Sequence, residues 1–124
     1  MINRIKVSIW DREFDLEYDL QNFPGEMVTD NQKKAVEFIS KTDFAESKVL
    51  VEQYIYKNNQ ADIKDGVIGN IFRYVMPKNI VIPREDDKVV FAILCDYKFD
   101  MEHGLAIVYE GTECKEIGTE DIIL

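Results

Sequence analysis

Polar and apolar residues alternate almost without interruption from Ile5 to Leu20. Successive side chains of a β-strand point to opposite faces, so this period of two fits a strand with one buried face and does not fit a helix. With Asp11 and Arg12 at the tip, the run predicts an antiparallel hairpin over about residues 3–20. Its buried face would hold Ile5, Val7, Ile9, Phe14, Leu16 and Tyr18. The expected cross-strand pairs are Ile9 with Phe14, Val7 with Leu16, Ile5 with Tyr18, Lys6 with Glu17, and Arg4 with Asp19.

The opposite face of this hairpin is acidic. Acids occupy five consecutive odd positions, and Trp10 shares the parity of that polar face. One interpretation is a solvated outer face that Arg4, Lys6 and Arg12 partly neutralise. The other is a docking surface for a basic partner, with Trp10 as an aromatic anchor among the acids. The candidate partner-binding residues are Trp10, Asp11, Glu13, Asp15, Glu17 and Asp19.

The middle of the chain is predicted to be helical. Thr29 and Gln32 have the spacing of a capping box and open a first helix, and Asp43 with Glu46 repeats the signal. The second helix is expected over about residues 44–57, whereas residues 61–76 indicate only a short helix. The residues expected to face the core are Ala35, Val36, Phe38 and Ile39 in the first helix, and Leu50, Val51, Tyr54 and Ile55 in the second.

The last part of the chain returns to strands. Residues 80–82 read as a short strand, and the following Pro83 suggests a sheet edge or a strand end. Residues 89–95 are apolar throughout, as in a central strand covered on both faces. Residues 105–109 and 114–117 form a final hairpin around Glu110 and Gly111. The whole order predicts one α+β domain, residues 1–124, in which two or three helices pack on one face of a mainly antiparallel sheet.

Charge and composition argue against several classes of function, namely binding to nucleic acids or membranes, metal binding and catalysis. The net charge of −9 repels nucleic-acid phosphates and anionic membrane surfaces, so neither is expected as a partner. The two cysteines and single histidine form no metal-binding spacing, Cys95 lies within an apolar strand, and no catalytic motif is present. We therefore expect no cofactor, no metal and no catalytic residue. The sequence has no hydrophobic leader or membrane-length run, which favours a cytoplasmic protein.

The densest polar cluster lies between two apolar strands. It is the candidate loop site, made up of Asp96, Asp100, Glu102, His103 and Gly104. In a structural interpretation, the acids accept backbone N–H groups, His103 fastens the loop and Gly104 takes a conformation that other residues resist. In a catalytic interpretation, the same side chains form a metal-dependent or acid/base centre, although the spacing of an EF-hand is missing. On the structural interpretation, His103→Gln would lower stability without abolishing ligand affinity.

A longer pattern surrounds this loop. The run CDYKFDMEHGLAIVYEG is followed by KEIGTEDIIL, with Ile117, Gly118 and Asp121 as looser matching positions. Over the last third of the chain this resembles the C-terminal Asp-x-Glu-His-Gly-Leu signature of a family of small bacterial domains of unknown function. The tryptophan that the family commonly has near the position of Phe99 is absent. Members often occur in toxin and immunity systems, so the resemblance implies an antitoxin-like role with a partner protein.

Three hypotheses follow from these observations. The leading one is a non-enzymatic protein-binding domain, an immunity protein that neutralises a basic toxin domain through its acidic surface. The alternative is a metal-dependent or acid/base enzyme centred on residues 96–103. The third is a structural or oligomerising module without a ligand.

Overall fold

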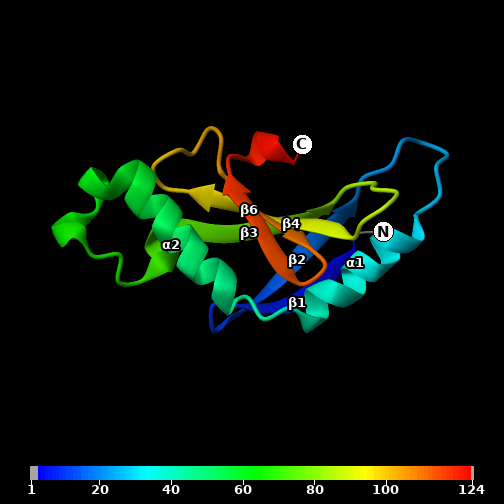
Figure 1. The fold of residues 1–124 in the computed structure, drawn as a ribbon, viewed down its shortest axis with the longest axis horizontal. Coiled ribbons are helices and arrows are strands. Elements are labelled where there is room, and N and C mark those ends of the chain that lie inside the picture. The colour runs from blue at the N-terminus through cyan, green and yellow to red at the C-terminus, as the bar shows by residue number, and fades with distance from the viewer. Residues whose placement is uncertain (1–2, 124) are drawn as a thin grey trace.

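A single six-stranded sheet organises the protein (Figure 1). The computed structural model describes residues 3–123. The strands lie side by side in chain order, and every neighbouring pair is antiparallel except β2 and β3, which are parallel. This confirms an α+β fold with a mainly antiparallel sheet. The strands are β1 (Arg4–Ile9), β2 (Arg12–Leu20), β3 (Val75–Ile82), β4 (Val90–Tyr97), β5 (Leu105–Glu110) and β6 (Glu113–Gly118).

The first hairpin has the predicted faces but a different register. Val7, Ile9 and Leu16 are buried, while Ile5, Phe14 and Tyr18 are partly buried against the same core. The tip is formed by Trp10 and Asp11, both with positive φ, and Ile9 pairs with Arg12. Successive positive φ angles at a two-residue tip are typical of the tight turn that matches strand twist. The expected pairing is therefore wrong by two residues, and because two is the side-chain period, every side chain keeps its face.

In chain order, two helices connect β2 to β3 (Figure 1). They are α1 (Asp30–Lys41) and α2 (Ala45–Asn59), close to the predicted bounds. The capping box of α1 is present, because Thr29 Oγ1 accepts from Gln32 N and Gln32 Oε1 accepts from Thr29 N, both at 3.0 Å. The one expected for α2 is wrong, because Asp43 accepts only from Ala45 N and the N-cap residue is Phe44. The buried Gln32 amide also donates to the carbonyls of Gln21 and Ile82. One side chain thus fastens the start of α1 to the ends of β2 and β3.

The segment after α2 contains three short 3-10 helices, Gln60–Asp62, Lys64–Gly66 and Ile71–Arg73, in place of the single short helix that was expected. Strand β3 is also longer than predicted and is the third strand of six, so it is not an edge strand. It accommodates Pro77 because the β3–β4 register shifts between Pro77 and Asn79. Proline has no backbone N–H to donate to the neighbouring strand, and it is therefore found in sheets at edges or at irregularities such as this one. Pro83 directly follows the end of the strand.

The sheet buries apolar residues on both faces. The main core joins the inward side chains of the strands to both helices, and includes Leu16, Phe91 and Ile107 with Ile39 and Val51. On the outer face, a smaller cluster is formed by Val81, Ala92, Leu94 and Ala106, with Ile123 packed against it. Strand β4 is therefore covered on both sides, as its sequence predicted. Within residues 3–123 no helix is long and apolar enough to cross a membrane.

Candidate functional site

The acids of β2 lie on the outer face of the sheet, opposite the helices. Glu13, Asp15, Glu17 and Asp19 are all exposed. Arg4 on β1 binds two of them, with 3.2 Å between its Nε and Asp15 Oδ1 and 3.0 Å between its Nη1 and Glu17 Oε1. These side chains are about half exposed, so each pair adds less than about 1 kcal/mol of stability. Their main effect is to neutralise part of the acidic strand.

The two ends of the acidic strand are less well compensated. Among residues 3–123, no basic side chain forms an ion pair with Glu13 or Asp19. Glu13 lies opposite Ser8 on β1, and Asp19 lies opposite Val81 on β3. The uncompensated negative charge of this face is therefore concentrated at Glu13 and Asp19, whereas the centre of the strand is paired with Arg4.

Trp10 does not belong to this acidic face, and its expected place there is wrong. Its side chain is 7% exposed, and its Nε1 donates to Ser47 Oγ of α2 at 3.2 Å. The ring also packs against Phe72, with 5.7 Å between centroids. Trp10 has a φ of 52°, so it occupies the turn and does not follow strand alternation. Its role in the structure is to join the hairpin tip to α2.

The candidate loop site separates into two groups. In the first, Asp100 organises the turn, because its Oδ1 accepts from His103 N at 3.1 Å and lies 3.0 Å from His103 Nδ1. The Asp100 carbonyl also accepts from Gly104 N. Hydrogen bonding to Asp100 raises the pKa of His103, and the backbone N–H of His103 lowers the pKa of Asp100. Glu102 is exposed beside this pair, and its charge also raises the pKa of His103.

These shifts predict a pH dependence of stability. The raised pKa of His103 means that its contribution is complete below about pH 6.5 and is lost as the pH rises through the folded-state pKa. The lowered pKa of Asp100 means that its contribution is complete above about pH 3.9 and is lost on acidification. His103→Gln should therefore lower the melting temperature more at about pH 5.5 than at about pH 8. An NMR titration of the single histidine should give a pKa above about 6.5, and a value at or below it would contradict the Asp100 contact.

The second group surrounds Gly104. Lys78 Nζ lies 2.8 Å from Glu120 Oε1 and 3.5 Å from Asp96 Oδ1. Glu120 also donates its backbone N–H to the His103 carbonyl. A Cβ at Gly104 would be 2.6 Å from Glu120 Oε1, so the absence of a side chain makes room for this carboxylate. Asp96 and Gly104 are thus parts of a contact that holds the C-terminal 3-10 helix, Glu120–Ile122, on the sheet.

The structure therefore does not gather the five loop residues around one point. Asp100 and His103 form one pair, while Asp96 forms an ion pair with Lys78 on β3. In the part of the chain that the structure describes, no group of three or more His, Cys, Asp or Glu side chains is arranged to hold a metal ion. Burial raises the pKa of the Cys95 thiol and raises that of Cys114 to about 11. Both thiols are therefore protonated at neutral pH.

A hollow of about 470 Å³ lies where β2 and β3 end. Because these strands are parallel, their carboxyl ends meet at the same edge of the sheet, and the loops that follow line this open hollow. Phe23 and Met27 on the first loop are 79% and 83% exposed. The residues that line the hollow are Asp19, Leu20, Gln21, Asn22, Phe23, Glu26, Pro83 and Arg84.

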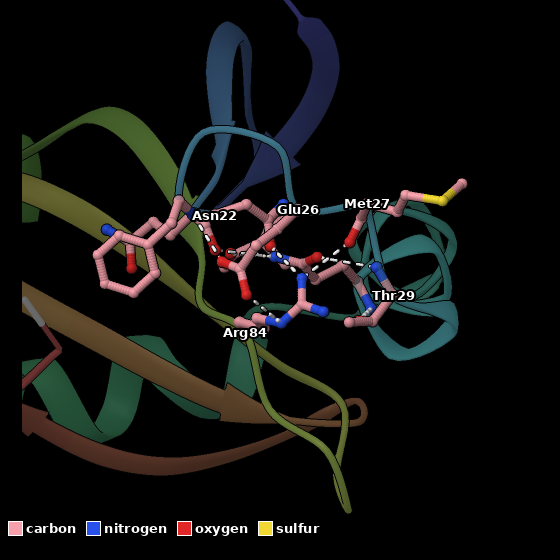
Figure 2. A network of polar contacts seen from close by, with 9 residues as sticks. Asn22, Glu26, Met27, Thr29 and Arg84 are labelled. Carbon is pink, nitrogen blue, oxygen red and sulfur yellow. Dashed lines mark hydrogen bonds and ion pairs between the residues drawn. The ribbon is translucent and has the colours of Figure 1, made fainter.

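Arg84 shapes this hollow by holding the β2–α1 loop (Figure 2). Its Nη1 donates to Asn22 Oδ1 at 2.7 Å and to the Met27 carbonyl at 2.8 Å. Its Nε lies 3.4 Å from Glu26 Oε2, and Glu26 Oε1 accepts from Phe23 N at 2.7 Å. The loop is thus tied at several points. Sequence reasoning missed this site, because only the parallel pairing of β2 with β3 brings residues 19–26 to Pro83 and Arg84.

Together these features define a small α+β domain that has an acidic outer sheet face and an open, loop-lined hollow at one end of that face. The sequence matches a family described as a domain of unknown function, DUF6985, over residues 3–124. The chain belongs to this family. No curated protein and no solved structure matches the chain.

Proposed function

We propose that the protein is a non-enzymatic binding domain that receives a basic protein on the acidic face of β2. The observation that carries this proposal is the placement of four acids on one rigid, outward strand face. Arg4 pairs only with acids in the middle of this face, so the charges of Glu13 and Asp19 are not neutralised by an ion pair among residues 3–123. A net charge of −9 extends the attraction for a basic partner beyond the contact itself.

We further propose that this partner is a toxin domain and that the chain is its immunity protein. Blocking a toxin requires fast capture, and complementary charge raises association rates strongly at low salt. The acidic face provides such a field, and the toxin and immunity setting implied by the C-terminal signature agrees with it. In this role the Asp100–His103 turn and the Lys78–Glu120 contact stabilise the domain and need no substrate.

The test measures association with basic protein domains encoded beside this chain's gene. The double variant Glu13→Lys/Asp19→Lys reverses the two uncompensated charges. Association should slow at least about tenfold at about 0.05 M salt and much less at about 0.5 M salt, because salt screens exposed charges. The matched control is Glu37→Lys/Glu116→Lys, which changes the net charge equally but alters exposed acids on α1 and β6.

Two results would contradict the proposal. Equal slowing by the control variant would show that net charge matters and the β2 face does not. If none of the neighbouring basic domains binds, the immunity role is wrong, and a co-expression assay in which the chain gives no protection from the encoded domain would confirm that conclusion.

A further inference from the structure

The hollow at the ends of β2 and β3 adjoins the acidic face, because Asp19 belongs to both. Its volume lies within the range of about 300–1,000 Å³ that is usual for ligand-binding pockets. Three charged side chains line it, namely Asp19, Glu26 and Arg84. The chemistry of an occupant depends on which of these charges are already engaged.

Arg84 is engaged by the protein itself. Its Nη1 donates hydrogen bonds to Asn22 Oδ1 and the Met27 carbonyl, and its Nε forms an ion pair with Glu26 (Figure 2). An anion entering the hollow would therefore meet a guanidinium that is largely committed, together with two carboxylates that repel it. Asp19, by contrast, has no ion-pair partner among residues 3–123. The charge that the hollow offers to an occupant is negative.

Phe23 adds a second recognition element. It lines the same hollow and is 79% exposed, although a phenyl ring is normally buried. The loop that carries it is not loose, because Phe23 N donates to Glu26 and Arg84 fixes Glu26 in turn. An exposed aromatic ring that lines the same hollow as an uncompensated carboxylate matches a planar cation, which can stack on the ring and pair with the acid.

We propose that the hollow receives an arginine side chain of the basic partner, with its guanidinium paired to Asp19 and stacked on Phe23. This inference rests on the proposed function, since the hollow continues the acidic face and would provide its specific anchor point. Arginine fits better than lysine, because a planar guanidinium both stacks and forms two parallel hydrogen bonds to a carboxylate. Phe23 then takes the place of the aromatic anchor that Trp10 does not supply.

The experiment uses N-acetyl-arginine amide as the probe and follows the backbone amides of the full chain by NMR. Saturable shifts are expected at residues 19–26 and 83–84, with a dissociation constant in the millimolar range. N-acetyl-citrulline amide, which has the same shape without the charge, should produce no saturable shift. Asp19→Asn and Phe23→Ala should each weaken arginine binding by about threefold or more. Glu13→Gln, at the other end of the acidic strand, should leave it unchanged.

Shifts spread over the whole surface, equal binding of the citrulline probe, or no effect of Phe23→Ala would each overturn the proposal. Both altered residues are exposed, and a melting curve for each variant tests whether it is folded. The two proposals fail separately. If Glu13→Lys slows capture of a basic protein but the arginine probe does not bind at the hollow, only the arginine site is wrong. If the probe binds at the hollow but charge reversal on β2 leaves capture unchanged, the proposed function is wrong.

Discussion

Replacing Gly104 by alanine is expected to lower the free energy of unfolding by roughly 2–4 kcal/mol. Two costs combine at this position. The φ of +62° is unfavourable for any residue with a side chain, and the new Cβ would lie 2.6 Å from Glu120 Oε1 and 3.0 Å from the Cys95 carbonyl. Glu120 can move only by weakening its ion pair with Lys78 and its place in the sheet contact. The Cys95 carbonyl belongs to β4 and cannot move freely.

Gly111 provides a matched control for this prediction. It has the same φ of +62°, but no atom lies within 4 Å of the position that a Cβ would take. Gly111→Ala should therefore cost only the backbone term, about 1–2 kcal/mol. Urea unfolding of the two variants separates the contributions. If the free energy of unfolding falls equally in both variants, the close approach of Glu120 to Gly104 does not contribute to the loss.

Leu16→Ala is expected to cost about 2–5 kcal/mol, the usual range when a buried leucine is truncated and leaves a cavity. Leu16 is 4% exposed and lies in the centre of β2, where it packs in the main core. The loss combines the apolar area removed from the core with the contacts that the surrounding side chains no longer make. Chemical denaturation of the variant measures it directly.

The comparison is Glu13→Ala, on the opposite face of the same strand. Glu13 is exposed and has no ion pair among residues 3–123, so its removal should change stability by about 0.5 kcal/mol or less. A small loss for Leu16→Ala together with a large loss for Glu13→Ala would mean that the two faces of β2 are assigned the wrong way round.

The alternation of residues 5–20 was sufficient to predict the faces of the hairpin but not its register. The face on which a strand residue lies depends only on whether its position is odd or even, and this can be read directly from the sequence. Register depends on the turn, and neither Trp10 nor Asp11 is a glycine or asparagine that would mark a tip with positive φ. Trp10 was misplaced for the same reason, since a residue in the turn is not governed by the alternation of the strands.

The candidate sites were predictable to different degrees. The acids of β2 follow from local alternation, and the Asp100–His103 turn follows from residues close in sequence. The Lys78–Glu120 contact and the hollow beside Arg84 depend on strands paired across long stretches of chain. No local pattern in residues 75–84 indicated that β3 would pair in parallel with β2. The length of β3 was missed because a proline is unusual within a strand. Pro77 lies next to a register irregularity with β4 and outside the stretch of β3 that pairs with β2.

The parallel β2–β3 pair also bears on synthesis of the chain. Strands β3–β6 follow one another by short connections and can pair in the order in which they leave the ribosome. The β1–β2 hairpin is made first, but β2 has no neighbour on its second edge until residues 21–74 and then β3 have been made. During that interval its unpaired backbone groups are open to other nascent chains. Two such hairpins meeting through β2 would bring their rows of carboxylates together, and the resulting repulsion would oppose this pairing.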